Sequence, residues 1–187
     1  MSGEQATLVA SAIAGDRRAF DSIVQQYQTR ITWYIFRLVN DEELALDLAQ
    51  DTFVNAFRHI QALRSDLALS SWLYRIATNL AVQARSRSRR ILWQPLANLE
   101  DSNWVATESP ERLVMDRELV ISALAKLPRD RAACLLLHVN EGFSYDEVAA
   151  IMNTTPEAVR KRIARAKEQF RCLYDAASKE SFSYAVR

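Results

Sequence analysis

Apolar residues recur at helical spacing through the first half of the chain. Over residues 6–39 they fall every three or four positions, and Gly15–Asp16 interrupts the pattern, so a short helix and then a longer one are predicted. The same spacing over residues 44–63, with Phe53 and Phe57 among the apolar positions, predicts an amphipathic helix of about 20 residues. A fourth helix is expected to begin near Ser70–Ser71 and to continue to residue 90. The polar face of the helix over 44–63 carries Asp47, Gln50, Asp51, Asn55 and Arg58.

The helical pattern breaks over residues 91–112, which hold two of the four prolines. We interpret this segment as a linker between a domain of residues 1–90 and a domain of residues 113–178, followed by a tail over 179–187. Linkers are normally polar, whereas this one is unusually apolar, and packing against the chain's own domains is favoured over binding in a partner's groove. Its apolar residues include Ile91, Leu92, Trp93, Leu96, Leu99 and Trp104.

Two short helices joined by a tight turn are predicted inside the second domain. Ser144 and Glu147 have the spacing of a capping box ahead of an apolar run, which marks a helix start. Thr155 and Pro156 supply an N-cap and a first-turn proline for the next helix. This arrangement predicts a helix-turn-helix.

The second helix of this motif is apolar on one side and cationic elsewhere. Val159, Ile163 and Ala166 fall within one narrow arc, whereas residues 160–171 include six basic side chains and one acid. Such a helix suits the major groove, where Arg and Lys contact phosphates and guanine edges. DNA binding is therefore favoured over an ordinary surface helix. The six basic residues are Arg160, Lys161, Arg162, Arg165, Lys167 and Arg171.

A second cationic cluster ends the first domain, a short way after Trp72. An aromatic face beside cations is what single-stranded nucleic acid requires. A basic run also stabilises the C-terminal end of any helix, and the spacing of Trp72 from Ile76 favours a core position for the tryptophan. The cluster consists of Arg85, Arg87, Arg89 and Arg90.

Composition narrows the fold class and the function classes. With 3 Gly and 4 Pro in 187 residues and an apolar fraction of 49%, the chain is expected to be all-α with a packed core. The totals of 24 Lys+Arg and 23 Asp+Glu are balanced, but basic residues concentrate toward the end of each predicted domain.

No catalytic or metal-binding pattern is visible. Cys134 and Cys172 fit a reducing compartment, and neither has metal-ligand spacing with His59 or His138. There is no phosphate loop or nucleophile motif, so no cofactor, metal, small-molecule substrate or enzymatic activity is expected. The absence of a long apolar run and of a signal-peptide pattern predicts a cytoplasmic protein.

Three stretches of the chain resemble the extracytoplasmic-function (ECF, group 4) sigma factors of the sigma-70 family. Residues 47–53, D-L-A-Q-D-T-F, are similar to the region 2.2 signature, with Asp51 where Glu is commoner. Residues 72–79, W-L-Y-R-I-A-T-N, are similar to the core of regions 2.3–2.4, and residues 143–167 are similar to region 4.2. The motifs stand in the family's order and flank a proline-containing linker, so the resemblance covers nearly the whole chain.

The resemblance implies two small helical domains, sigma region 2 and sigma region 4. It also implies a factor that binds core RNA polymerase at the β′ clamp and β flap and directs transcription from promoter DNA. Control by an anti-sigma factor, which a membrane anchor could hold, is implied as well. The implied core-binding residues are Asp47, Gln50, Asp51 and Asn55. Those for the −10 element are Trp72, Arg75, Asn79, Arg85, Arg87, Arg89 and Arg90, and those for the −35 element are Glu157, Ala158, Arg160, Lys161, Arg162 and Arg165.

Some positions depart from the family pattern and leave alternatives open. The recognition helix begins with Glu157 and Ala158 where a Gly-Thr pair is usual, and Lys161 stands where Ser is common, so the −35 sequence is not specified. A one-component regulator, with the helix-turn-helix on an operator, is the second interpretation; its sensor would need an apolar pocket in place of the arginine cluster. A structural scaffold is the third, and it would not need a cationic helix.

Overall fold

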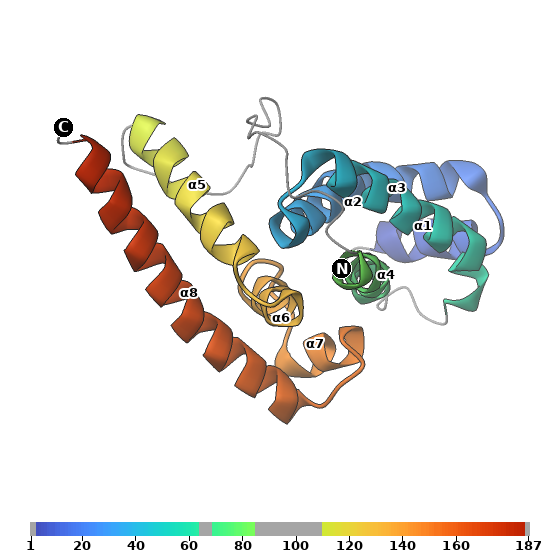
Figure 1. The fold of residues 1–187 in the computed structure, drawn as a ribbon. Helices are drawn as coiled ribbons and strands as arrows, with labels where there is room; N and C mark the ends of the chain where they lie inside the picture. Colours follow the sequence, from blue (N-terminus) through green and yellow to red (C-terminus); the bar gives the residue numbers. More distant parts are fainter. Residues whose placement is uncertain (1–2, 64–68, 85–109, 186–187) are drawn as a thin grey trace.

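The computed structural model describes residues 3–63, 69–84 and 110–185. Within these ranges the chain forms α-helices and one short 3-10 helix, with no strand, which confirms the all-α prediction (Figure 1). The elements are α1 (Gly3–Ile13), α2 (Arg17–Val39), α3 (Glu42–His59), η1 (Ile60–Ala62), α4 (Leu69–Gln83), α5 (Pro110–Ala125), α6 (Arg129–Val139), α7 (Tyr145–Ile151) and α8 (Pro156–Ala185).

Short-range hydrogen bonds begin and end the long helices of the N-terminal half. The Asp16 carboxylate accepts hydrogen bonds from two backbone N–H groups in the first turn of α2, at 2.9 and 3.4 Å. Helix α2 ends at Asn40, whose φ of 52° lies in the left-handed region that suits a helix C-terminus. The next residue, Asp41, begins α3 by accepting from the N–H of Leu44 at 3.0 Å. The two caps confine the connection between α2 and α3 to Asn40 and Asp41.

Several helix boundaries differ from the predicted ones. Helix α4 spans Leu69–Gln83, so Ser70 and Ser71 lie inside its first turn and the helix ends before the predicted residue 90. Helix α3 becomes a 3-10 turn at Ile60–Ala62, so the last turn of the predicted helix over 44–63 is tightened. Helix α5 begins at Pro110, three residues before the predicted start of the second domain, because proline fits the first turn of a helix. Helix α8 continues to Ala185, through most of the predicted tail, and lies alongside α5 (Figure 1).

Helix α6 forms the centre of the C-terminal half. Its Ala133, Cys134 and Leu137 are fully buried. Helix α8 packs on it and buries Ile163, and α7 contributes the fully buried Val148. The helix-turn-helix made by α7 and the start of α8 is therefore held on α6.

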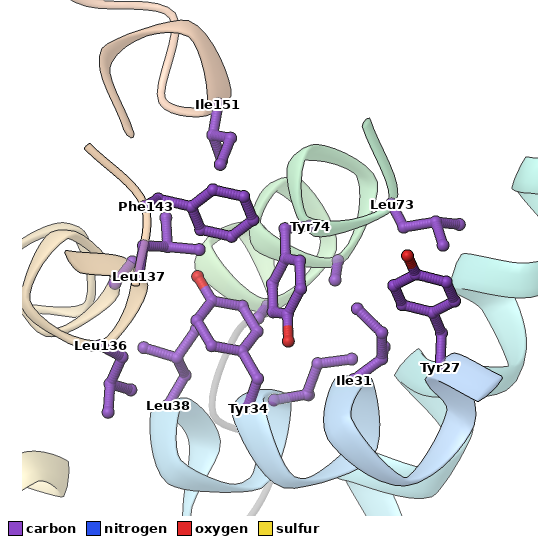
Figure 2. Packing of buried hydrophobic residues seen from close by; sticks show 14 of the residues in the cluster. Tyr27, Ile31, Tyr34, Leu38, Leu73, Tyr74, Leu136, Leu137, Phe143 and Ile151 are labelled. Carbon is purple, nitrogen blue, oxygen red and sulfur yellow. The ribbon is translucent and has the colours of Figure 1, made fainter. Parts of the chain in front are cut away.

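The two halves share one continuous core. Tyr74 of α4 lies between Tyr34 of α2 and Phe143 of the α6–α7 turn, with ring centroids 5.2 and 5.3 Å away (Figure 2). Leu137 and Ile151 of the C-terminal half belong to the same buried cluster. Helix α4 packs against α6 and α7, and α2 packs against α5 and α6. The halves predicted as separate modules are thus in direct contact, and the predicted linker lies outside the described residues except for 110–112.

Candidate protein and nucleic-acid interfaces

Helix α3 exposes apolar side chains along a groove that it forms with α2. Leu46, Val54 and Phe57 are 52%, 38% and 46% exposed. They line the groove together with Gln50 and with Phe20 of α2. The ring of Phe57 packs edge-on against Phe20, with centroids 5.1 Å apart. Apolar side chains gathered on a hollowed surface are typical of a protein-binding site.

The four predicted core-binding residues lie beside this groove on α3. Asp47, Gln50 and Asp51 are exposed, and Gln50 lines the groove itself. Asn55 is half-buried, and its amide donates to the backbone carbonyl of Asp51 at 2.9 Å. Their spacing places all four on one side of the helix. The arrangement combines an apolar groove with an acidic border.

Sequence reasoning did not identify the apolar part of this surface. It assigned Phe57 to the buried stripe of the helix, whereas the structure buries Phe53 and leaves Phe57 half exposed. Leu46, Gln50, Val54 and Phe57 recur at intervals of four, four and three residues, which is a second stripe beside the buried one. This second stripe could have been used to predict the groove from the sequence.

Helix α4 carries the predicted −10 residues on its exposed side. Arg75 and Asn79 are exposed and stand one turn apart. Trp72 is half-buried and packs against the core, so the structure combines a core contact with partial exposure of this ring. The other predicted −10 residues, Arg85, Arg87, Arg89 and Arg90, lie outside the described residues.

The capping box predicted at the start of α7 is confirmed. The backbone N–H of Ser144 donates to the Glu147 carboxylate at 2.8 Å, and the backbone N–H of Glu147 donates to Ser144 Oγ at 3.3 Å. These hydrogen bonds from the Ser144 backbone and side chain lower the pKa of Glu147. The predicted N-cap of α8 is also present, because Thr155 Oγ1 accepts from the N–H of Ala158 at 3.2 Å. The helix-turn-helix prediction therefore holds at both helix starts.

The first turns of α8 have a buried face and an exposed cationic face. Val159, Ile163 and Ala166 are buried. Most of the predicted −35 residues are exposed, and the cationic ones among them are available to an anion. The exposed ones are Glu157, Arg160, Lys161 and Arg165, whereas Ala158 and Arg162 are half-buried.

Two arginines of α8 contact other side chains of the C-terminal half. Arg160 pairs with Glu157 at 3.7 Å and lies over the Tyr145 ring at 5.3 Å from its centroid. Arg162 pairs with Asp130 of α6 at 3.6 Å, and this salt bridge holds its side chain against α6. Lys161 and Arg165, the cations predicted to reach base edges, lie on the exposed side of the helix.

The described ranges contain neither a cluster of metal-ligand side chains nor a membrane-spanning helix. Among these residues, no three His, Cys, Asp or Glu side chains gather as potential metal ligands. No helix in the same ranges combines the length and apolar character needed to cross a membrane.

Comparison with protein families matches two separate parts of the chain. Residues 23–91 match the model of sigma-70 region 2, and residues 117–170 match that of sigma-70 region 4. The RNA polymerase sigma-H factor of Pseudomonas aeruginosa is 36% identical over 171 residues, covering 86% of this chain and 89% of the relative. The ECF RNA polymerase sigma-E factor of Escherichia coli strain K12 is 33% identical over 171 residues, covering 86% and 89%.

Two solved structures are similar to the whole arrangement. The structure of CnrH in complex with the cytosolic domain of CnrY has a TM-score of 0.70 and 28% sequence identity, covering 92% of this chain and 97% of that one. The structure of the sigma factor RpoE with the anti-sigma factor NepR from Bartonella quintana has a TM-score of 0.61 and 20% identity, covering 83% and 96%, and it shows similarity of fold.

Proposed function

The chain belongs to the sigma-70 family as an extracytoplasmic-function sigma factor, and we propose how its surfaces serve promoter-directed transcription initiation. In this scheme the polymerase carries out the chemistry, and the chain supplies promoter recognition. Coverage of both halves by sigma-factor relatives supports a role for both domains. The factor acts in the cytoplasm, on core RNA polymerase and promoter DNA.

The α2–α3 groove is the proposed docking surface for core polymerase. Leu46, Val54 and Phe57 would be covered by an apolar partner surface, and burial of such side chains drives most protein association. Asp47 and Asp51 at the border would orient the complex through charge, since rim charges mainly affect specificity and association rate. The family resemblance makes the coiled coil of the β′ clamp the expected partner. The apolar exposure of α3 is the observation that carries this proposal.

Helices α4 and α8 are the proposed promoter-reading elements. Arg75 and Asn79 on α4, with the half-buried Trp72, would bind the −10 element as unpaired bases, which must leave the stack to be read. Lys161 and Arg165 on α8 would enter the major groove at the −35 element. Arg162 has a smaller part in this scheme because Asp130 already holds it.

Control by an anti-sigma factor is part of the proposal. CnrH, which is similar over 92% of this chain, has been solved in complex with the cytosolic domain of CnrY. A protein partner of that kind would hold this factor inactive until a signal releases it. The flap of the polymerase and a membrane-anchored regulator are further proposed partners, which follow from the family resemblance.

Run-off transcription with core polymerase and a promoter library tests the function as a whole. We expect transcripts from a subset of promoters only when this chain is added. Gel shifts with a selected promoter duplex should be weak without core and specific with it. A tight, specific shift without core and no added transcription would contradict the proposal and favour an operator-binding regulator.

The docking surface is tested by reversing charge on α3. The double variant Asp47→Lys/Asp51→Lys should reduce the affinity for core polymerase about tenfold while leaving the helical content unchanged, since both side chains are exposed. The matched control is Glu168→Lys/Asp175→Lys, which makes the same charge change on the exposed side of α8. Equal affinity of the two variants for core polymerase would show that the charged border is not part of the docking surface.

A further inference from the structure

One acidic side chain stands in the middle of the cationic face of α8. Glu157 lies in the first turn of this helix, directly after Pro156, and its side chain is 70% exposed. At about 100° per residue its position is opposite the buried side of the helix and falls between those of Arg160 and Lys161. The N-terminal residues of a recognition helix are the ones that contact base edges. Glu157 therefore stands where base reading is expected.

The helix dipole alone does not account for this carboxylate. An acid in the first turn of a helix is favourable because the N-terminal end of the helix carries partial positive charge. The start of α8 is already capped, however, since Thr155 Oγ1 accepts from the backbone N–H of Ala158 at 3.2 Å. A carboxylate on the face that approaches DNA is also repelled by the phosphates. Glu157 thus has a cost on this face that a base contact would offset.

The neighbour of Glu157 is held by a stack of planar groups. The Arg160 guanidinium lies 3.7 Å from the Glu157 carboxylate and 5.3 Å from the centroid of the Tyr145 ring on α7. The Tyr145 ring stacks on His138 of α6, with centroids 4.3 Å apart and an angle of 29° between the planes. The Nδ1 atom of His138 donates to the carbonyl oxygen of Phe143 at 2.8 Å. The stack therefore restricts the exposed Glu157–Arg160 pair before DNA is bound.

An ionised carboxylate distinguishes the bases by its lack of a donor. In the major groove cytosine presents the N4 amino group, from which Glu accepts a hydrogen bond. Guanine presents the acceptors N7 and O6, and thymine presents the acceptor O4, so either base would place an oxygen or nitrogen lone pair against the carboxylate. Adenine places its N7 acceptor beside its N6 donor. A glutamate at this point selects cytosine both by attraction and by exclusion of the other bases.

We propose that Glu157 is a specificity residue of this factor, which selects cytosine at one position of the −35 element by accepting from its N4 amino group. Arg160 and Tyr145 are positioning residues in this scheme, because they hold the carboxylate in place. The inference rests on the proposed role of α8 in reading the −35 element and deepens it by naming the base. It also accounts for an acid in the middle of a cationic face.

The main test is Glu157→Gln in the holoenzyme, measured by competition binding on promoter duplexes that carry each base pair in turn at every position of the −35 element. The parent should prefer cytosine at one position by about tenfold. A glutamine amide both donates and accepts, which suits adenine N6 and N7. The variant should therefore exchange the preference for cytosine for one for adenine at that position and keep its other preferences.

The matched control is Glu168→Gln, which removes the same charge from an exposed position of the same helix. Eleven residues separate Glu168 from Glu157, which is about three turns, so the two lie on nearly the same side and about 16 Å apart along the axis. Removal of a charge without a base contact changes the affinity for all duplexes alike. The control should therefore keep the preference for cytosine.

The positioning role is tested at Tyr145. Tyr145→Leu removes the ring beneath the Arg160 guanidinium and should reduce the preference for cytosine about two- to fivefold, whereas Tyr145→Phe keeps the ring and should retain it. A purely structural role would lower the affinity for every duplex and leave the ratio between bases unchanged. Circular dichroism establishes that each variant is folded. An unchanged base ratio in Tyr145→Leu would show that Tyr145 does not hold the carboxylate.

The outcomes separate this inference from the proposed function. A parent with −35 preferences that Glu157→Gln leaves unchanged would overturn the inference and leave the role of α8 intact. A base other than cytosine at the position that responds to Glu157→Gln would overturn it too, as would the same switch in the Glu168→Gln control. A parent with no preference anywhere in the −35 element would contradict the proposed role of α8 itself, and the inference with it.

Discussion

Helix α4 and the first turns of α8 perform similar proposed tasks but are held in place differently. Both expose polar or cationic side chains above a buried face. The start of α8 is capped by Thr155, only three residues from its partner N–H. Helix α4 instead depends on partners that are distant in sequence. Its Thr78 forms a 2.7 Å hydrogen bond with Tyr34, and its Tyr74 donates to Glu141, 67 positions further along the chain. The start of α8 is thus supported within its own half of the molecule, whereas α4 also forms hydrogen bonds with the other half.

This difference indicates where regulation can act on the molecule. A change in the contact between the halves alters the surroundings of α4 directly, because Arg129 and Glu141 both bind it or its side chains. The same change leaves the capping hydrogen bonds of α7 and α8 intact. The two proposed promoter-reading helices should therefore differ in their sensitivity to mutations that are remote in sequence.

The largest expected effect is on the core beneath α4. Leu73 is fully buried, and Leu73→Ala should lower the free energy of unfolding by about 2–5 kcal/mol because it leaves a cavity. Val82→Ala on the same helix, where the side chain is 36% exposed, should change it by about 0.5 kcal/mol or less. Urea unfolding followed by circular dichroism measures both. Equal effects would mean that α4 does not depend on its buried face.

The next effect concerns the exposed cations of α8. Lys161→Ala and Arg165→Ala should each weaken promoter binding by the holoenzyme, by about 1–3 kcal/mol where the side chain reaches a base edge. A phosphate contact should weaken all promoters alike, whereas a base contact should change preference at one position. Competition binding over a set of −35 variants separates the two. Unchanged transcription from every promoter after both substitutions would contradict the assignment of α8.

A comparable effect at a different step is expected on α4. Arg75→Ala/Asn79→Ala should reduce formation of the open complex about tenfold and affect initial promoter binding less, because stacking and backbone contacts act on unpaired bases. Permanganate footprinting of melted thymines, beside gel shifts of the closed complex, measures the two steps. The control is Lys161→Ala, which should impair the earlier step. If each variant impaired closed-complex binding and open-complex formation equally, the proposed division of roles between α4 and α8 would be wrong.

A smaller effect tests the local support of the helix-turn-helix. Ser144→Ala should lower the free energy of unfolding by about 1 kcal/mol, because it removes the N-cap acceptor of α7. Tyr74 and Glu141 are not altered, so the distance between the halves should stay at its parental value. Thermal unfolding gives the first quantity, and pulsed electron resonance between one spin label on each half gives the second. A changed distance would show that the cap and the domain contact are coupled.

The smallest effect is a pH dependence of the same cap. The pKa of Glu147 is lowered in the folded state by the Ser144 hydrogen bonds, so its contribution to stability is present at neutral pH and is lost as the pH falls below about 4.5. The stability difference between the parent chain and Glu147→Gln should therefore shrink on acidification. Unfolding at pH 7 and at about pH 4 measures it. A difference that grows at low pH would have the wrong sign for this carboxylate.

The sequence by itself determined the features that are made within a few residues. The capping box of Ser144 and Glu147, the N-cap at Thr155 and the apolar arc of α8 all involve positions within one or two turns. Local hydrogen bonds and helical periodicity have the same outcome wherever the segment is placed, and the family motifs share this property. For that reason the all-α class and the helix-turn-helix were both predictable.

Only the tertiary structure decided which surfaces meet. The periodicity of α3 contains two apolar stripes, and packing against the rest of the core selected the one with Phe53 and left Phe57 in the groove. From the sequence Arg162 is one more cation of α8, but the fold places Asp130 of α6 within 3.6 Å of its guanidinium. In the sequence Glu141 is an ordinary loop acid, yet two of the donors to its carboxylate are 67 and 111 positions away. The free energy of such contacts depends on desolvation and on partners brought together by the whole fold, and no local pattern encodes either.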